Sequence, residues 1–340
     1  MDPVRIGVLG CADIARRRML PAMRDCADVE LVAVASRHAA TAAATAADFH
    51  CRPVTGYPAL LEIPDVDAVY VPLPAALHAP WVSAALQAGK HVLAEKPLTT
   101  DLAATRRLAA LAADGGLALM ENVMFVHHSR HERVRALVAD GAIGAPRTFQ
   151  ATFAVPRLPE SDIRYDPALG GGALWDTGVY PVRAAVHFLG EGLRVEGAVL
   201  AGDAGGRVDT AGTALLSTPD GVTAQLAFGL DHSYRSCYEI WGSAGRIVVD
   251  RAFTPPAGHP ARIVLERRTG TEEITLAPED QVHRTLVAFA LAVRTGAPLP
   301  PASLHQAALL EELRRSAADG KNPGRHPART MLTQVDSSLT

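Results

Sequence analysis

Residues 91–98 read His91-Val92-Leu93-Ala94-Glu95-Lys96-Pro97-Leu98, an apolar run that ends abruptly in an acid, an amine and a proline. A short apolar run without polar alternation is typical of a strand buried on both faces. We therefore expect a strand that delivers Lys96 to the edge of a sheet. The chain has only three lysines, Lys90, Lys96 and Lys321, and an amine, unlike a guanidinium, can release a proton. A reacting lysine is favoured, and a lysine merely solvated beside Glu95 is the alternative.

The composition is that of an ordinary globular protein: 340 residues, 48% hydrophobic and 20% charged, long enough for two domains with separate cores. The formal net charge of -3 offers no basic field to nucleic acid. The cysteines, at positions 11, 26, 51 and 237, show neither metal-ligand nor disulfide spacing, so we expect a reduced, cytoplasmic compartment. We recognise no signal peptide and no apolar run that could span a membrane, so no membrane partner is expected.

A phosphate-binding turn follows the first predicted strand, residues 4–10. The run Gly10-Cys11-Ala12-Asp13-Ile14-Ala15 fits the dinucleotide fingerprint Gly-x-Gly-x-x-Gly/Ala, with alanine at the second and third glycine positions. The pattern alone is weak, because small residues can close any turn between a strand and a helix. Its setting is stronger, since a helix over 14–23 and a second strand over 30–35 complete a βαβ unit. The start of that helix can hold a phosphate.

Cofactor choice is usually decided at the end of the second strand, where NAD(H) enzymes place a carboxylate that binds the ribose hydroxyls. Here the chain reads Ala35-Ser36-Arg37-His38, with a hydroxyl, a guanidinium and an imidazole but no carboxylate. Such groups form strong charge-assisted hydrogen bonds with a phosphate. The sequence therefore predicts NADP(H) as the cofactor, and an arginine that only solvates a loop is the alternative.

Strands and helices alternate as far as Glu121, which predicts an α/β Rossmann domain with a doubly wound parallel sheet. Prolines in Pro72-Leu73-Pro74 end one buried strand and stiffen the loop after it. His78 then opens a helix that runs to about residue 89. Ligands of such sheets bind at the carboxyl ends of the strands. The residues that fall at these ends are Ser36, Leu73 and Lys96.

A second polar cluster lies in Gly170-Gly171-Gly172-Ala173-Leu174-Trp175-Asp176-Thr177-Gly178-Val179-Tyr180. We expect a helix to begin near Thr177, capped by Asp176 or Thr177, with Pro181 among its first residues. Asp176 and Tyr180 are four residues apart and so share a helix face. The alternative is a helix cap and a half-buried tyrosine without chemistry.

The chain resembles the Gfo/Idh/MocA oxidoreductases. The resemblance rests on the fingerprint at Gly10, on the Pro-Leu-Pro loop, and above all on Ala88-Gly89-Lys90-His91-Val92-Leu93-Ala94-Glu95-Lys96-Pro97, which matches the family signature Ala-Gly-Lys-His-Val-x-x-Glu-Lys-Pro. Residues 176–180 match a second signature, Asp-x-Gly-x-His/Tyr. The chain departs from the family at Ala75-Ala76, where Pro-Asn is frequent, so amide contacts are not carried over there.

The resemblance implies that Lys96 and Tyr180 converge on the reacting oxygen of the substrate beside the nicotinamide, with Asp176 as the third catalytic residue. It also implies a set of cofactor-binding residues drawn from the turn, the strand ends and the two signatures. They are Gly10, Cys11, Ala12, Asp13, Ile14, Ser36, Arg37, His38, Leu73, Pro74, His78, Glu95, Lys96, Pro97 and Trp175.

After residue 121 the pattern changes, which divides the chain into a dinucleotide-binding domain, 1–121, and a substrate-binding and oligomerisation domain, 122–340. Segments of the second domain read as strands separated by turns: 148–154, 194–199, 210–217, 223–229, 236–243, 246–249, 262–267 and 272–276. We expect an α+β domain with a large, mostly antiparallel open sheet and helices on one side. The open face favours a homodimer or homotetramer. A final helix over 301–318 precedes an extended tail from Lys321.

His127, His128 and His131 are spaced closely enough to suggest a metal site, but no carboxylate at a catalytic zinc spacing accompanies them, and no metal is predicted. By analogy with the family segment after Glu121, we place His128 beside the substrate.

The run Trp241-Gly242-Ser243-Ala244-Gly245-Arg246, with residues 250–256 after it, looks like family members that reduce keto groups of nucleotide-linked sugars, including 3-ketoreductases of deoxysugar pathways. We therefore expect NADPH-dependent reduction at C-3 of a nucleotide-linked deoxysugar, with dTDP as the expected nucleotide. Besides Asp176 and Tyr180, the residues expected to contact this substrate or its diphosphate are Tyr234, Arg235, Arg251 and Arg262. Each of these four could equally be a solvated strand residue.

The expected chemistry is hydride transfer from NADPH to the carbonyl carbon, with a proton donated to the developing alkoxide. Tyr180 is the expected donor, while Lys96 lowers the pKa of the tyrosine and stabilises the oxyanion. For Lys96 to be the acid, its pKa would have to fall by about three units, which costs roughly 4 kcal/mol. Three alternatives remain: a dehydrogenase of free sugars or cyclic polyols, a glucose–fructose type enzyme whose cofactor never leaves, and a dinucleotide-binding sensor without turnover.

Overall fold

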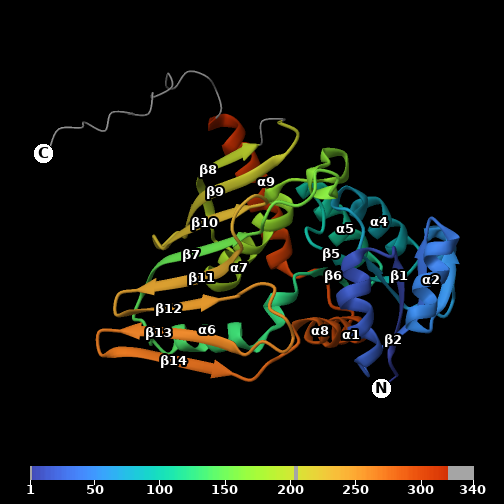
Figure 1. Cartoon of the computed structure of the whole chain (residues 1–340), viewed down its shortest axis with the longest axis horizontal. Helices are drawn as coiled ribbons and strands as arrows, with labels where there is room; N and C mark the ends of the chain where they lie inside the picture. The colour runs from blue at the N-terminus through green and yellow to red at the C-terminus, as the bar shows by residue number, and fades with distance from the viewer. Residues whose placement is uncertain (1, 203–205, 321–340) are drawn as a thin grey trace, which may run out of the picture.

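The computed structural model describes residues 2–202 and 206–320. Two sheets follow one another along the chain, a six-stranded parallel sheet and an eight-stranded mixed sheet (Figure 1). The predicted fold class, a Rossmann domain followed by an α+β domain with an open sheet, is confirmed. No helix in the described ranges combines the length and hydropathy that a bilayer crossing requires.

The first sheet has the order β3-β2-β1-β4-β5-β6 with every neighbouring pair parallel. Its strands are β1 (Val4–Leu9), β2 (Val29–Ser36), β3 (Arg52–Thr55), β4 (Ala68–Val71), β5 (His91–Glu95) and β6 (Leu119–Asn122). The helices around it are α1 (Leu20–Asp25), α2 (Ala39–Phe49), α3 (Tyr57–Leu61), α4 (His78–Gln87) and α5 (Leu102–Asp114). Strand order reverses between β1 and β4, and open α/β sheets bind ligands at such a point. Lys96 follows β5 at this edge of the sheet.

The backbone conformation of the turn after β1 favours a glycine. Gly10 has φ 123°, and a Cβ atom there would lie 2.9 Å from Cδ2 of Leu73. The predicted first helix is present but begins as a π-helical turn, Ala15–Met19, that continues into α1. Neighbouring short 3₁₀ turns are Ala75–Leu77, Met124–His127, Ile163–Tyr165 and Pro167–Leu169.

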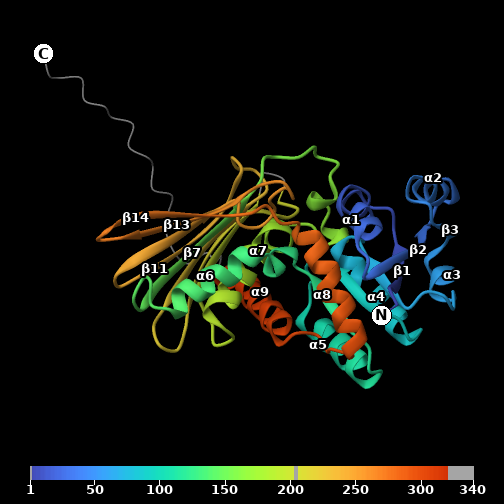
Figure 2. The same ribbon diagram turned by 90° about the horizontal axis from the view of Figure 1, so that it is seen from below.

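The second sheet has the order β14-β13-β12-β11-β7-β10-β9-β8, and only the β7/β10 pair is parallel. Its strands are β7 (Pro146–Ala154), β8 (Arg194–Gly202), β9 (Asp209–Ser217), β10 (Thr223–Gly229), β11 (Arg235–Gly242), β12 (Gly245–Asp250), β13 (Ala261–Arg267) and β14 (Gly270–Leu276). All the predicted strands of this half are confirmed, because their alternation of apolar and polar residues matches a sheet covered on one face. Helices α6 (Ser129–Ala139) and α7 (Val179–Leu189) lie against that face (Figure 2).

The start of α7 differs from the prediction. The chain is already helical in a π-helical turn, Leu174–Gly178, and the backbone N–H of Leu174 donates to the carboxylate of Asp209 at 2.7 Å. Asp176 therefore does not cap the helix, and Thr177 instead donates its hydroxyl to the carbonyl of Ala173. The capping preference of Asp176 is overridden because its carboxylate binds two cationic side chains. Such π-helical turns are frequent at functional sites.

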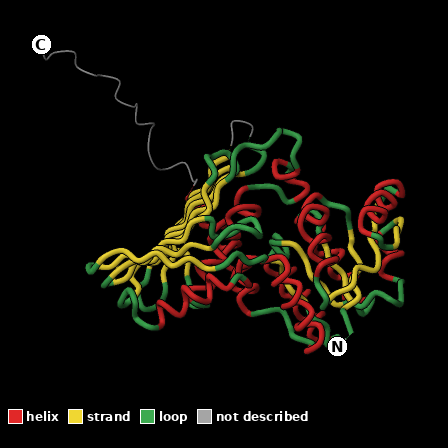
Figure 3. The backbone as a smooth tube through the Cα atoms, turned by 60° about the horizontal axis from the view of Figure 1, so that its bottom comes forward, coloured by secondary structure: helices red, strands yellow, loops and turns green. Residues whose placement is uncertain are grey.

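The last two helices join the two halves. Helix α8 (Gln281–Thr295) packs against the first sheet and α1, and places Leu286 and Phe289 in that core. Helix α9 (Pro301–Gly320) lies between α5 and α7 (Figure 2) and confirms the predicted final helix. Figure 3 shows the strands of the two sheets in yellow and the helices in red. The predicted tail from Lys321 lies outside the described residues.

A buried polar network lies where α7, α9 and the first sheet meet. The guanidinium of Arg183 lies 3.4 Å from Oε2 of Glu121 and donates to Ser303 and Gln306 at 3.0 and 3.2 Å. Glu121 also accepts a hydrogen bond from the backbone N–H of Leu98, at 3.0 Å. The network connects the helix that carries Tyr180 to the loop that carries Lys96.

Replacing Arg183 with methionine should lower the free energy of unfolding by about 3 kcal/mol, because it leaves the buried carboxylate of Glu121 without its cation. Denaturant titration followed by circular dichroism measures this loss. Arg262→Met is the matched control, since Arg262 pairs with Glu273 at 2.7 Å with side chains 61% and 49% exposed. An exposed pair contributes about 0–1 kcal/mol. Equal losses in the two variants would contradict the assigned importance of the network.

Candidate functional site

A cavity of about 1000 Å³ lies between the carboxyl edge of the first sheet and the second half of the chain. One wall comes from the turn after β1, the Pro-Leu-Pro loop and residues 95–97. The opposite wall comes from β7, from the loop over residues 158–171, and from the helical segment that carries Asp176 and Tyr180. Its volume lies at the upper end of the range of small-molecule and cofactor sites.

The three predicted catalytic residues meet in this cavity, although they come from both halves of the chain. The amine of Lys96 donates to Oδ1 of Asp176 at 2.9 Å and to the backbone carbonyl of Asp176 at 2.8 Å. The same nitrogen lies 4.9 Å from the centroid of the Tyr180 ring. The side chains of Lys96 and Asp176 are only 12% and 25% exposed. The predicted convergence of Lys96 and Tyr180 is therefore present in the fold.

Charge pairing keeps Lys96 and Asp176 ionised. Burial alone lowers the pKa of Lys96, but the carboxylate of Asp176 beside it raises that pKa to about 12. Burial raises the pKa of Asp176, and the positive charges of Lys96 and Arg164 outweigh it and lower the pKa to about 2. Lys96 is thus a fixed cation rather than an acid that gives up its proton near neutral pH.

Tyr180 lines the cavity with its ring held among aromatic side chains. Its centroid lies 4.6 Å from that of Phe153 and 5.8 Å from that of Phe253. Burial raises the pKa of Tyr180 above its usual value, and the nearby Lys96 offsets only part of that rise. We predicted that Lys96 lowers the tyrosine pKa. Its effect has that sign, but the net direction is upward, because desolvation of the phenolate is the larger effect.

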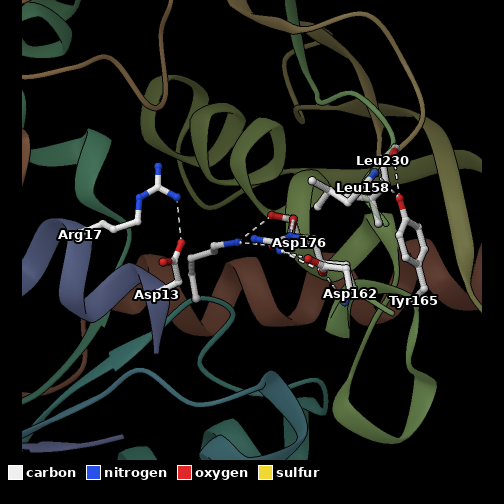
Figure 4. A network of polar contacts seen from close by, with 9 residues as sticks. Asp13, Arg17, Leu158, Asp162, Tyr165, Asp176 and Leu230 are labelled. Atoms are coloured by element: carbon white, nitrogen blue, oxygen red, sulfur yellow. Dashed lines mark hydrogen bonds and ion pairs between the residues drawn. The ribbon is translucent and has the colours of Figure 1, made fainter. Parts of the chain in front are cut away.

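Arg164 is a member of the site that sequence analysis missed. Its Nε donates to Oδ2 of Asp176 at 2.8 Å, and its Nη1 lies 3.1 Å from Oδ1 of Asp162 (Figure 4). Asp176 is thus held between Lys96 from the first half and Arg164 from the loop. Arg164 lies in a loop whose sequence has no periodic pattern. Its role can be seen only in the structure, where Asp162 and Asp176 lie beside it.

Asp176→Asn should move the basic limb of the pH–rate profile to lower pH. Without the carboxylate, burial lowers the pKa of Lys96, and the rise that Asp176 causes in the pKa of Tyr180 is also lost. Lys96 and Tyr180 are still protonated at low pH in the variant. As the pH rises, both lose their protons earlier than they do in the wild type. The shape of log(kcat/KM) against pH measures this. Asp162→Asn, which does not touch Lys96, should keep the wild-type limb, and an unchanged limb in Asp176→Asn would refute the coupling.

Glu95, which was predicted to contact the cofactor, lines the cavity, and hydrogen bonds fix the position of its carboxylate. Its Oε1 accepts hydrogen bonds from the hydroxyl of Tyr70 and from Nδ2 of Asn122, both at 2.6 Å. Both donors are buried side chains of the neighbouring strands β4 and β6. Glu95 is therefore fixed at the base of the cavity rather than free to pair with Lys96.

The other predicted cofactor residues fall into three groups. Those that line the cavity are Ala12, Asp13, Ile14, Leu73, Pro74, Pro97 and Trp175. Those that lie at the turn after β1 or at the end of β2, outside the cavity lining, are Gly10, Cys11, Ser36, Arg37 and His38. His78 is buried beneath the loops, with its two ring nitrogens 2.8 Å from the carbonyl of Pro97 and 2.7 Å from that of Leu73. It holds the two cavity loops in place.

Five predicted substrate residues do not line the cavity, and one of them, Arg262, pairs instead with Glu273. His128 is fully buried at the start of α6, where its ring accepts a hydrogen bond from the N–H of Arg130. Arg235 contacts the thiol of Cys237 at 3.0 Å. The last two, Tyr234 and Arg251, stack on each other, with the guanidinium carbon 5.9 Å from the ring centroid. Sequence alone does not show which side chains reach a cavity that forms between distant segments, and these side chains lie outside its lining.

The histidines that suggested a metal site have other contacts. Nδ1 of His131 lies 2.9 Å from the hydroxyl of Tyr238, and Nδ1 of His128 lies 3.1 Å from Glu279. Among residues 2–202 and 206–320, no group of three or more His, Cys, Asp or Glu is arranged to hold a metal ion.

A Rossmann turn with its glycine at positive φ, together with a paired lysine and a tyrosine that line one cavity, defines a dinucleotide-dependent oxidoreductase. Residues 4–123 match the oxidoreductase family with an NAD-binding Rossmann fold, GFO/IDH/MocA, and residues 131–248 match the GFO/IDH/MocA C-terminal domain. The chain belongs to the Gfo/Idh/MocA family, as the signatures predicted.

The chain is similar over most of its length to the following three proteins. A dTDP-3,4-didehydro-2,6-dideoxy-alpha-D-glucose 3-reductase of Saccharopolyspora spinosa is 56% identical over 86% of this chain and 89% of its own length. KijD10, a 3-ketoreductase from Actinomadura kijaniata solved in complex with NADP and TDP-benzene, is 50% identical with a TM-score of 0.90 and covers 92% of this chain and 98% of its own. The aldose-aldose oxidoreductase of Caulobacter crescentus is 25% identical with a TM-score of 0.86, over 94% of this chain and 98% of its own.

Proposed function

We propose that this protein uses NADPH to reduce the C-3 keto group of a dTDP-linked deoxysugar. The observation that carries the proposal is the meeting of Lys96, Asp176 and Tyr180 in a cavity that also borders the dinucleotide turn. The substrate class comes from the relatives that are 50% or more identical over most of the chain.

A further similarity to KijD10 supports the roles of Lys96 and Tyr180. That protein has also been crystallised with one lysine replaced by alanine and with one tyrosine replaced by phenylalanine. The two altered positions have the same separation in sequence as Lys96 and Tyr180. We therefore assign the corresponding roles at the reacting carbonyl to Lys96 and Tyr180.

The residues at the first turn fit a dinucleotide. Gly10 has no Cβ atom, which leaves space next to its backbone. The side chains of Leu73 and Tyr57 border that space. Ser36 is the last residue of β2, and Arg37 and His38 follow it at the same edge. These three residues would surround a 2′-phosphate. When bound, NADPH supplies the hydride that reduces the carbonyl carbon.

The protein itself supplies the proton and the charge. Tyr180 donates its phenolic proton to the carbonyl oxygen as negative charge develops there, and the amine of Lys96 stabilises both that charge and the phenolate left behind. Asp176 and Arg164 hold Lys96 in place, and Asp176 keeps it charged. The alcohol product carries the hydride on carbon and the tyrosine proton on oxygen, and solvent returns a proton to Tyr180.

A direct test is NADPH consumption, followed at 340 nm, with dTDP-3,4-didehydro-2,6-dideoxyglucose as substrate. We expect steady turnover with that compound and little with xylose, glucose or inositol in either direction. Turnover only with a free sugar or polyol would favour the dehydrogenase alternative. Nicotinamide absorbance that co-purifies and resists dialysis would favour a cofactor that never leaves, and binding without turnover would favour a sensor.

Wild-type protein should bind NADPH more tightly than NADH, and Arg37→Ala should reduce that preference by about tenfold or more, the usual contribution of a charge-assisted phosphate contact. Fluorescence titration of the two reduced cofactors gives both dissociation constants. The control is Arg52→Ala, an exposed arginine at the opposite end of the neighbouring strand β3. Equal or tighter NADH binding by the wild type would refute the assignment.

The proposal includes a division of labour along the chain. Residues 1–121 hold the dinucleotide, and residues 122–340 shape the substrate side and form the subunit interface. The open face of the second sheet carries Val199, Leu215 and Trp241 with 64%, 42% and 54% of their surfaces exposed. A second copy covering that face would give a homodimer or homotetramer, which light scattering measures.

The cysteines among the described residues are free thiols, in keeping with a cytoplasmic location.

A further inference from the structure

The cationic side chains that line the cavity are Arg17, Arg18, Lys96 and Arg164. Three of them already have acidic partners in the fold. Lys96 and Arg164 both bind Asp176, and Nη1 of Arg17 lies 2.9 Å from Oδ2 of Asp13 (Figure 4). Each of these three positive charges therefore already has a carboxylate partner in the fold.

Arg18 differs from the other three. It is half-buried in the π-helical turn that follows the dinucleotide fingerprint. Over the described ranges, no side chain or backbone group forms a hydrogen bond or ion pair with its guanidinium. A partly desolvated guanidinium with five unused donors in a ligand cavity is well suited to bind an anion, because it can form two parallel hydrogen bonds to phosphate oxygens.

We propose that Arg18 binds the diphosphate of the nucleotide-sugar substrate. The inference rests on the proposed function, because it takes a sugar diphosphate as the substrate. It replaces the prediction from sequence that Arg235 and Arg251 contact this diphosphate, because both residues lie outside the cavity lining.

The cofactor also carries a diphosphate, so the two sources must be separated. The backbone N–H groups of the turn at Gly10 and the start of the first helix serve the cofactor diphosphate. Arg18 lies eight residues beyond Gly10 on a wall of the cavity that also contains Lys96. Backbone N–H groups therefore account for the cofactor diphosphate. Arg18, which has no partner among the described residues, is available for the diphosphate of the substrate.

The apolar lining beside this charge suits the nucleoside part of the same ligand. Ile14, one turn before Arg18, and Ile163, on the loop of the second half, both line the cavity and are 37% and 49% exposed. Large apolar side chains exposed in a ligand cavity favour burial of a ring. A cation next to apolar side chains is the combination that a nucleoside diphosphate needs.

The test measures two affinities on Arg18→Gln and on the wild type. TDP binding is measured by calorimetry on protein saturated with NADP, and NADPH binding by fluorescence titration. We expect Arg18→Gln to weaken TDP about tenfold or more, the loss of a charged hydrogen-bond pair, while NADPH affinity changes less than about threefold. Arg18→Lys should recover part of the TDP affinity, and the unchanged NADPH affinity shows that the variants are folded.

Arg16→Gln is the matched control, because Arg16 is exposed on the same turn, lies 4.0 Å from Asp48 and does not line the cavity. It should leave both affinities unchanged. Weaker NADPH with unchanged TDP in Arg18→Gln would assign Arg18 to the cofactor, and no change in either would give it no ligand; both results overturn the inference alone. Failure of the wild type to bind TDP would overturn the nucleotide-sugar function as well.

Discussion

Lys96→Ala should slow the reduction by about two to four orders of magnitude and leave NADPH affinity within about fivefold of the wild type, the range typical of a lost oxyanion-stabilising or proton-transfer group. The amine donates a hydrogen bond to Asp176 and lies 4.9 Å from the centroid of the Tyr180 ring. Its removal leaves the developing alkoxide without a nearby cation, because Arg164 is held on the far oxygen of Asp176. Single-turnover rates with saturating NADPH measure the chemical step directly.

The chain offers a matched control in Lys90, the other lysine of the same signature. Its amine donates to the backbone carbonyls of Ile63 and Val66 at 3.0 and 2.7 Å, away from the cavity. Lys90→Ala should reduce stability and leave the single-turnover rate unchanged. A wild-type rate in Lys96→Ala would remove Lys96 from the chemistry.

Tyr180→Phe should lower kcat by about a hundredfold or more, because it removes the proton donor and keeps the ring in its aromatic surroundings. Binding of NADPH and of TDP should stay near wild type, since the change deletes one oxygen. Turnover in deuterated water adds a second readout. If proton transfer to oxygen becomes the difficult part of the step, the solvent isotope effect on kcat should rise in the variant, while a merely structural loss would leave it unchanged.

Tyr238→Phe is the control for losing a buried phenol. Its hydroxyl lies 2.9 Å from Nδ1 of His131 in the core of the second half, outside the cavity lining. It should cost about 1 kcal/mol of stability with no effect on kcat. Wild-type turnover in Tyr180→Phe would transfer the proton-donor role to another group.

The parts of the fold that depend on local pattern could be predicted from sequence. The strands of the second sheet alternate apolar and polar residues, and His91 to Lys96 form a buried strand that ends at the site, as expected. The pair Lys96 and Tyr180 could be found because each lies in a signature whose spacing is fixed.

The parts that depend on contacts between distant segments could not. Arg164 and Arg18 look like any other arginines in this chain until the fold shows which of them face the cavity and which have partners. The start of the helix near Asp176 was misplaced for the same reason, since the ion pairs that occupy its carboxylate come from residues 80 positions before it and 12 positions before it. Arg235 and Arg251 were chosen for charge, and charge does not tell on which face of a sheet end a side chain lies.

The packing of α8 onto the first sheet sets the order in which the chain can mature on the ribosome. Leu286 and Phe289 complete the hydrophobic core against β1, β2 and α1, which are synthesised more than 200 residues earlier. The nascent dinucleotide-binding half must therefore wait, with an apolar face uncovered, until almost the whole polypeptide has emerged. Expression of residues 1–121 alone would leave that face permanently open, and aggregation of this fragment is the expected result.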